Sequence, residues 1–197
     1  MEQAKKKRLK ETSQTTEGAS EKKLNAAEEL KMKKNGLDVL EDIPYYIRDG
    51  WESIPPEERD RLKYVGVFYR RQTPGAFMMP LRKTCGFSNA HQFRTIVEIS
   101  DAFGTGFVDL TTRQQIQLRG FTIENVRKIW NRLAAVGLNS YQTGFDNIRG
   151  VTGCPVAGLT PNELFDAAPF ARQFTEMFVG NKEYTNIPRK FNVCITG

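Results

Sequence analysis

The stretch from Asp109 to Gly120 concentrates side chains that donate hydrogen bonds. It contains two arginines, and its uncharged polar residues are Thr111, Thr112, Gln114, Gln115 and Gln117. Arginine presents a planar fork of donors that fits a carboxylate or a phosphate two bonds at a time. Two interpretations are open: the stretch is the solvent-exposed polar face of a strand pair, or it captures an anionic ligand.

The spacing and the context of this stretch favour the second interpretation. A strand places alternate residues on one face, and this parity is shared by Thr111, Arg113, Gln117 and Arg119. Two later polar segments, residues 143–149 and 187–192, are also centred on basic side chains. The sequence therefore predicts an anion-binding surface built from three separate segments.

The composition is that of a protein with a packed core. The chain has 197 residues, 39% of them hydrophobic, and a net charge of +6. We expect one domain or slightly more, and no membrane span, because no apolar run approaches the ~20 residues that a span needs. Basic and acidic residues are mixed at the N-terminus. We therefore expect residues 1–33 to form a basic tail that is disordered or at most weakly helical, with a nucleic-acid-binding arm as the alternative.

The three cysteines, Cys85, Cys154 and Cys194, are widely spaced and form no Cys-x-x-Cys pair. This pattern predicts neither a disulfide framework nor a metal site in this chain, and it suits a reducing compartment such as the cytoplasm. The single histidine, His91, is predicted to lie on a helix surface rather than to act as a ligand.

Apolar periodicity and turn residues predict an α+β fold. Residues 34–63 form a short helical segment broken by prolines and a glycine, and residues 64–71 form a strand. A strand, a helix, two strands, a helix and a strand follow at 76–83, 88–104, 107–110, 116–120, 122–137 and 140–142. Their order, β-α-β-β-α-β, is that of a ferredoxin-like half-domain.

Proline and capping residues refine this prediction. Pro80 predicts that its strand lies at an edge of the sheet or contains a bulge, since proline has no N–H to donate to a strand ladder. Ser88 and Thr122 are predicted to cap the two helices, and Phe93, Ile96 and Val97 to form the apolar face of the first. A third helix is predicted to start at Thr160-Pro161 and to be interrupted by Pro169.

The polar segments, taken in order, resemble the sirohaem-containing nitrite and sulfite reductases, and specifically the ferredoxin-dependent nitrite reductases. The resemblance runs from about Lys34 to Gly197. Its main motifs are Thr73-Pro-Gly-Ala-Phe-Met-Met79, Thr111-Thr-Arg-Gln114, Gln117-Leu-Arg-Gly120, Asp146-Asn-Ile-Arg149 and Pro188-Arg-Lys-Phe-Asn192. No single motif is specific, but their order and spacing are.

The resemblance implies a domain organisation. Residues 64–145 would be the nitrite/sulfite reductase ferredoxin-like half-domain, and residues 146–197 the start of the sirohaem/4Fe-4S domain. In the family the sequence continues past the equivalent of Gly197, where the second half-domain and the four cluster cysteines lie. We therefore expect a truncated chain whose 4Fe-4S ligands are supplied from elsewhere.

The resemblance also implies the residues of a site. The carboxylates on the sirohaem rim would be held by Thr111, Arg113, Gln117, Arg119, Asn147, Arg149, Arg189 and Lys190. The substrate anion would lie beside Arg149, Lys190 and Asn192. Sulfite-reducing members typically carry a lysine in place of Asn192, so this residue favours nitrite. The family typically has an arginine at position 80, and Arg82 is the candidate to replace it.

The function implied is the N-terminal part of an assimilatory nitrite reductase that reduces nitrite to ammonia with six electrons from ferredoxin. The resemblance and composition together imply a monomer of the cytoplasm or the plastid stroma, with no nucleic-acid or membrane partner. Three alternatives stay open. They are a sulfite reductase of the same family, a non-catalytic ferredoxin-like module that binds an anion, and an inactive product of a degraded gene.

Overall fold

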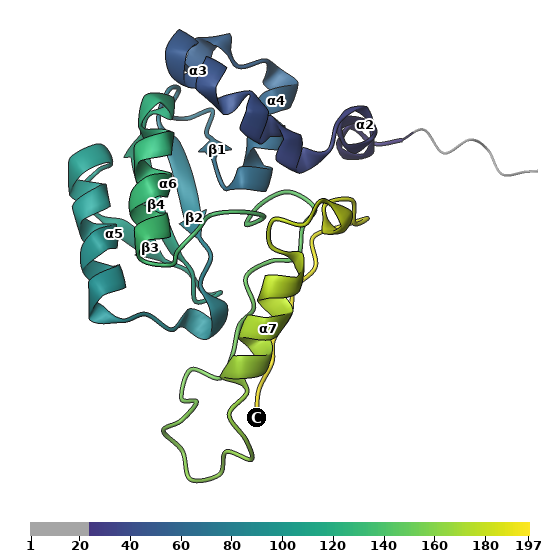
Figure 1. The fold of residues 1–197 in the computed structure, drawn as a ribbon. Coiled ribbons are helices and arrows are strands. Elements are labelled where there is room, and N and C mark those ends of the chain that lie inside the picture. Colours follow the sequence, from purple (N-terminus) through teal and green to yellow (C-terminus); the bar gives the residue numbers. More distant parts are fainter. Residues whose placement is uncertain (1–23) are drawn as a thin grey trace, which may run out of the picture.

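The computed structural model describes residues 24–197, and Figure 1 shows their arrangement. The first described element is helix α2 (Ala26–Lys33), whose first turn is capped by Asn25. The Asn25 side chain accepts hydrogen bonds from the backbone N–H groups of Ala27 and Glu28, both at 3.0 Å. Disorder was therefore wrong for residues 26–33, where the helical alternative holds. The remaining part of the predicted tail, residues 1–23, lies outside the described residues.

Short helices fill residues 34–65, as the prolines and glycine predicted. They are the 3-10 turn η1 (Gly36–Glu41), α3 (Ile43–Asp49), η2 (Trp51–Ser53), α4 (Pro56–Arg61) and η3 (Leu62–Val65). The predicted strand at 64–71 was too long. Only β1 (Phe68–Tyr69) is extended, because Tyr64 and Val65 belong to η3 and are buried in the core.

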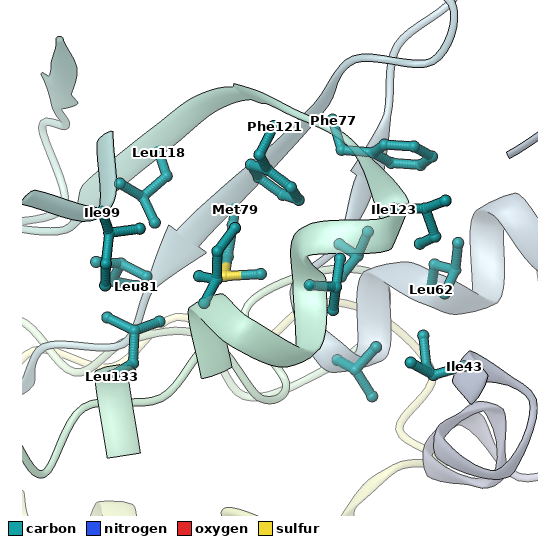
Figure 2. Close-up of a cluster of buried hydrophobic side chains, with 14 of the residues drawn as sticks. Ile43, Leu62, Phe77, Met79, Leu81, Ile99, Leu118, Phe121, Ile123 and Leu133 are labelled. Carbon is teal, nitrogen blue, oxygen red and sulfur yellow. The ribbon is translucent and has the colours of Figure 1, made fainter. Parts of the chain in front are cut away.

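Four antiparallel strands form the sheet in the order β1-β2-β4-β3. The remaining strands are β2 (Phe77–Leu81), β3 (Val108–Leu110) and β4 (Ile116–Phe121). Helices α5 (Ala90–Phe103) and α6 (Val126–Ala135) supply core residues that pack on one face of this sheet. Figure 2 shows Met79, Leu81 and Leu118 directed at that core. The other face of the sheet is left for polar side chains.

Pro80 lies where the sheet tolerates it. It pairs with Gln117 of β4, while β1 pairs only with Phe77 and Met78. One side of β2 is thus without a neighbouring strand at Pro80, so the missing N–H breaks no ladder on that side. The prediction of a local edge holds at this residue, although β2 itself is an inner strand.

Helix α5 begins one residue later than predicted. Asn89, not Ser88, is the N-cap, and it forms a capping box with Gln92. The buried face carries Ile96 and Ile99, whereas Phe93 and Val97 are 45% and 48% exposed. The predicted face also included Ser100, and it was correct for Ile96 and Ser100 but wrong for Phe93 and Val97, because the helix turns its Thr95–Ile99 side toward the core.

The region after α5 shows two more differences. Helix α6 buries Val126, Ile129 and Leu133, but Thr122 precedes the separate 3-10 turn η5 (Ile123–Asn125) rather than α6 itself. The predicted last strand at 140–142 is only an isolated bridge between Arg82 and Asn139. The ladder stops there because the backbone N–H of Gln142 donates to the Tyr64 carbonyl rather than to β2.

The C-terminal region, residues 146–197, packs beside the end of β2. Its helix α7 (Ala168–Phe178) has Pro169 in the first turn, where a proline breaks no helical hydrogen bond. The predicted start at Thr160 and interruption at Pro169 were therefore wrong, and Thr160 lies in a turn. A last 3-10 turn, η6 (Lys182–Tyr184), precedes the segment that returns to the sheet.

Candidate functional site

A cavity of about 310 Å³ lies on the polar side of the sheet, and we call it the candidate anion site. Strand β2 contributes Met78 and Pro80, and strand β4 contributes Gln117. The β3–β4 turn and two C-terminal segments contribute Thr111, Arg113, Arg149, Lys190 and Asn192. The lining thus holds three cationic side chains and no carboxylate among the described residues.

The β3–β4 turn, rather than strand alternation, brings Thr111 and Arg113 to the cavity. The turn is closed by the Thr111 N–H, which donates to the Gln115 carbonyl at 2.9 Å. Gln114 adopts a left-handed backbone, with φ of 57°, which reverses the chain. The expectation that four residues share one strand face was therefore wrong: Gln117 and Arg119 lie on β4, and Thr111 and Arg113 precede it.

The buried Gln115 joins this turn to the end of β2. Its side chain accepts from the Lys83 N–H and donates to the Lys83 carbonyl, both at 2.8 Å. Gly150 packs against it so closely that an added Cβ would lie 2.6 Å from the Gln115 amide carbon. A glycine is required at position 150 for the loop that carries Arg149 to approach the turn. Sequence reasoning counted Gln115 only as a polar residue and missed this role.

Both arginines of the cavity are held by backbone carbonyls. Arg113 donates to the Gly150 carbonyl at 2.8 Å, and Arg149 donates to the carbonyls of Thr143 and Phe145. A guanidinium has five N–H donors, so donors remain for a ligand. Burial lowers the pKa of Arg149, and the like charge of Arg113 lowers it further. The cavity therefore has a positive potential that an anion would relieve.

The two C-terminal segments that complete the cavity run parallel to one another. The Arg149 N–H donates to the Phe191 carbonyl at 2.8 Å, and the Phe191 N–H donates to the Asn147 carbonyl at 3.0 Å. Alternate residues of the second segment, Lys190 and Asn192, consequently face the cavity. Arg189 lies outside the lining, in an adjoining hollow that it shares with Arg149 and Lys190.

Three other residues predicted from the sequence lie away from this cavity. Arg119 forms an ion pair with Asp109 across the β3–β4 pair. Asn147 is fully buried and donates to the Gly144 carbonyl at 2.6 Å, which shapes its own loop. Arg82 is 4% exposed and donates to the carbonyls of Tyr141, Gln142 and Ile148, so it cannot take the place of an arginine at position 80.

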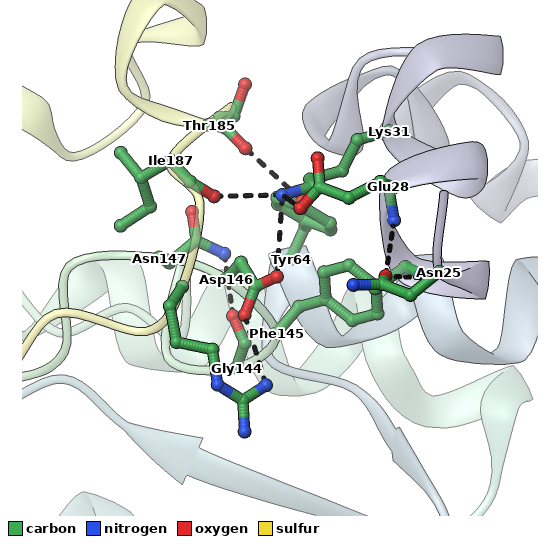
Figure 3. Close-up of polar contacts among 12 residues, drawn as sticks. Asn25, Glu28, Lys31, Tyr64, Gly144, Phe145, Asp146, Asn147, Thr185 and Ile187 are labelled. Atoms are coloured by element: carbon green, nitrogen blue, oxygen red, sulfur yellow. Dashed lines mark hydrogen bonds and ion pairs between the residues drawn. The ribbon is translucent and has the colours of Figure 1, made fainter. Parts of the chain in front are cut away.

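An ion-pair network beneath the site ties helix α2 to the two C-terminal segments (Figure 3). The Lys31 side chain is 3% exposed, and its ammonium donates to the Ile187 carbonyl at 2.9 Å and lies 3.5 Å from Asp146. Asp146 also lies 3.8 Å from Arg189. This network was missed because residues 1–33 were predicted to be a tail. The available signal was the spacing of Glu28 and Glu29 three and four residues before Lys31 and Lys33, which is typical of a helix surface.

The other candidate ligands are scattered. Within residues 24–197 no three His, Cys, Asp or Glu side chains come together in a way that could hold a metal ion. The three cysteines are free, and burial raises the pKa of Cys85. His91 is exposed in the first turn of α5. None of the described helices is long and apolar enough to cross a membrane.

The fold and the cavity together define an α+β protein in which a ferredoxin-like half-domain and the segment that follows it line the candidate anion site. Residues 69–136 match the nitrite/sulfite reductase ferredoxin-like half domain, and residues 144–197 match the nitrite and sulphite reductase 4Fe-4S domain. These two matches cover more than half of the chain. The chain belongs to the nitrite and sulfite reductase family, and the predicted family and fold class are confirmed.

Similar proteins of known name agree with this assignment. A ferredoxin–nitrite reductase of Synechococcus elongatus is 43% identical over 91% of this chain and 36% of that protein. A chloroplastic ferredoxin–nitrite reductase of Zea mays is 36% identical over 88% of this chain and 33% of its own length. The structure of the Mycobacterium tuberculosis NirA protein superposes with a TM-score of 0.82 at 31% identity, covering 88% of this chain and 35% of that one. The chain thus spans about a third of the length of these relatives.

Proposed function

We propose that this chain forms the N-terminal part of a ferredoxin–nitrite reductase, in which it holds the sirohaem and the nitrite anion. The observation that carries the proposal is the candidate anion site, where Arg113, Arg149 and Lys190 meet with no carboxylate in the lining. The whole enzyme would reduce nitrite to ammonia with six electrons from ferredoxin. Its relatives bear that name, and the site gives the name a physical basis.

The residues of the cavity suit a ring with many carboxylates. Thr111, Arg113 and Gln117 would donate to the rim carboxylates from the sheet side, and Arg149 and Lys190 from the side of the C-terminal segments. The sirohaem iron, when bound, supplies the centre at which the anion is reduced. Arg149 and Lys190 would stabilise the negative charge of the bound anion, because their charges are already in place before the substrate arrives. The 4Fe-4S ligands would come from outside this chain.

Asn192 supports nitrite rather than sulfite as the substrate. It lines the cavity next to Lys190, so a lysine at this position would bring a further cation to the anion. Sulfite carries more negative charge than nitrite and would gain more from that cation. A site with a neutral amide here discriminates in favour of the monoanion.

Pro80 sets the expected efficiency of the site. It lines the cavity at the position where the family typically has an arginine. Arg82 does not replace that arginine, because its guanidinium donates to the carbonyls of residues 141, 142 and 148. Loss of one preorganised charged donor typically lowers a rate by about 10²–10³. We propose that the chain acts in the cytoplasm or the plastid stroma, since its relatives include a ferredoxin–nitrite reductase of Synechococcus elongatus and a chloroplastic one of Zea mays.

The first test measures sirohaem binding by the 197-residue chain. Absorbance titration should give a dissociation constant that Arg149→Gln raises about 10-fold or more, since a charged hydrogen bond is worth ~1.5–3 kcal/mol. The matched control is Arg127→Gln on the exposed side of α6. Equal affinities for the two variants would contradict the proposal.

The second test addresses catalysis in a complete enzyme. Residues 64–197 would replace the corresponding segment of the Synechococcus relative, and ammonia formation from nitrite would be followed with a reduced viologen as donor. The hybrid should turn over slowly, and Pro80→Arg should raise its rate about 10-fold or more. A hybrid that prefers sulfite would contradict the assignment of nitrite as the substrate. A hybrid whose rate does not rise with Pro80→Arg would contradict the role given to position 80.

A further inference from the structure

A second cavity, of about 620 Å³, lies at the far end of β2, outside the candidate anion site. We call it the β2-end cavity. It is bordered by the 3-10 turn η4 (Thr84–Gly86), the start of α5 and the middle of α7. Three cationic residues line it, Arg82, Lys83 and Arg172, against a single carboxylate, Glu176. Nothing in the proposed function uses this cavity.

Three polar atoms around this cavity are buried and lack a hydrogen-bond partner among the described residues. They are Nη1 of Arg82, Nζ of Lys83 and Oγ of Ser88. Arg82 is 4% exposed and Lys83 is 3% exposed. The Lys83 ammonium is a buried charge without a hydrogen-bond partner, which is costly, and Arg82 and Ser88 each add one buried donor without a partner. A ligand with several acceptor atoms would compensate these donors.

Lys83 cannot leave this environment by a shift of its backbone. Its N–H and its carbonyl are both bound by the Gln115 side chain. The nearest described compensation for its ammonium is the ring of Phe93, whose centroid lies 5.6 Å away. Burial lowers the pKa of Lys83 to about 8, so the ammonium form still predominates at neutral pH.

Arg82 and Ser88 approach the same cavity from different elements. Arg82 follows β2, and its other guanidinium nitrogens are fixed by the carbonyls of Tyr141, Gln142 and Ile148. Ser88 immediately precedes the Asn89 cap of α5. The lysine stem has four rotatable bonds, so the ammonium can reach a ligand by a change of rotamer without a shift of the backbone.

We propose that the β2-end cavity is a second anion site, which binds a small oxyanion such as sulfate or phosphate through Lys83, Arg82 and Ser88. The oxyanion would offer several acceptors to these unpartnered donors of one cavity lining. Arg172, exposed on α7, adds a positive charge at the entrance, while Glu176 disfavours larger polyanions. This inference stands apart from the proposed function, because neither Lys83 nor Ser88 lines the candidate anion site.

Sulfate titration of the 197-residue chain at constant ionic strength, with chloride as the balancing ion, tests the proposal. Amide NMR resonances of residues 84–92 should shift saturably. At about 100 times the dissociation constant the melting temperature should rise by about 5–10 °C. Lys83→Met should abolish the sulfate-dependent rise, and without sulfate this variant should melt about 2–4 °C above the wild type, because a buried unpaired charge is gone.

Matched variants separate this site from other sources of stabilisation. Lys128→Met removes a charge from the exposed side of α6 and should keep the full sulfate response. Lys190→Met disables the candidate anion site and should leave the shifts at residues 84–92 in place. If Lys83→Met fails to fold, Ser88→Ala serves instead and should weaken sulfate binding about 2–10-fold, the value of one hydrogen bond. Shifts that persist in Lys83→Met, or a wild type without saturable shifts, would overturn the proposal.

Discussion

One lysine is buried in the ion-pair network beneath the candidate anion site and another beside the β2-end cavity. Their surroundings differ, because the first ammonium has partners for its charge and the second has none among the described residues. The Lys31 side chain is 3% exposed and contacts Glu28, Asp146 and the Ile187 carbonyl. Lys83 is 3% exposed, and its ammonium has no hydrogen-bond partner among residues 24–197. Equal burial therefore says little about stability. A buried lysine stabilises when its partners are present and destabilises when they are missing.

The largest expected effect is the loss of the complete network. Lys31→Met should lower the free energy of unfolding by about 3 kcal/mol, because Asp146 would stay buried with only the more distant Arg189 as a partner. Urea unfolding measures this change. Lys33→Met is the control, since the Lys33 side chain is 63% exposed on the same helix and should cost under about 1 kcal/mol. Similar losses in both variants would show that the network contributes nothing specific.

Anion binding at the candidate site should distinguish two arginines of one polar stretch. Arg113→Gln should weaken the binding of sirohaem about 10-fold or more, because Arg113 lines the cavity. Arg119→Gln should leave the affinity within about twofold, because Arg119 is paired with Asp109. The absorbance titration described above measures both. A comparable loss of sirohaem affinity in Arg119→Gln would show that Arg119 also contributes to the site.

The pH dependence of stability should reveal the unpartnered lysine. The pKa of Lys83 is lowered from 10.5 to about 8 by burial, so the unfolded chain binds more protons than the folded one between these values. Stability contributed by this group therefore rises with pH across that window. The gain should be about 1–2 kcal/mol, reduced from the full shift by solvent screening. Wild type and Lys83→Met compared by urea unfolding at pH 7 and pH 10 should show the difference, and parallel pH profiles would contradict it.

The smallest expected effect concerns the positioning of Lys31. Asn25→Ala removes the side-chain cap of α2 and should cost about 1 kcal/mol. If α2 orders the segments that carry Arg149 and Lys190, amide exchange at residues 187–192 should become faster in this variant. Asn181→Ala, which removes the cap of the 3-10 turn η6, is a control for general loosening of the C-terminal region. Unchanged exchange in Asn25→Ala would separate α2 from the site.

Local sequence signals predicted the elements but misplaced several of their ends. Helix α6 and the short helices of residues 34–65 follow directly from apolar spacing and proline. The strand predicted at 64–71 shrank to Phe68–Tyr69, and the one at 140–142 to an isolated bridge. In both places hydrogen bonds to residues far away in the sequence set the backbone conformation. The Gln142 N–H donates to the Tyr64 carbonyl, and the Ser140 hydroxyl donates to the Val65 carbonyl. No local pattern encodes such contacts.

The sequence by itself determined the class of fold and the family, and it supplied the cationic motifs on which the proposed site depends. Alternating apolar residues and turn signals act over a few positions, and the Arg, Lys and Asn motifs stand in the chain whatever their surroundings. Only the tertiary structure decided which cations serve the site. In the fold, Arg119 pairs with Asp109 and Arg82 donates to backbone carbonyls. Lys31 has partners for its charge, whereas the Lys83 ammonium has none among the described residues. The energy of a buried charge depends on neighbours that are far away in the sequence, so no local pattern predicts these outcomes.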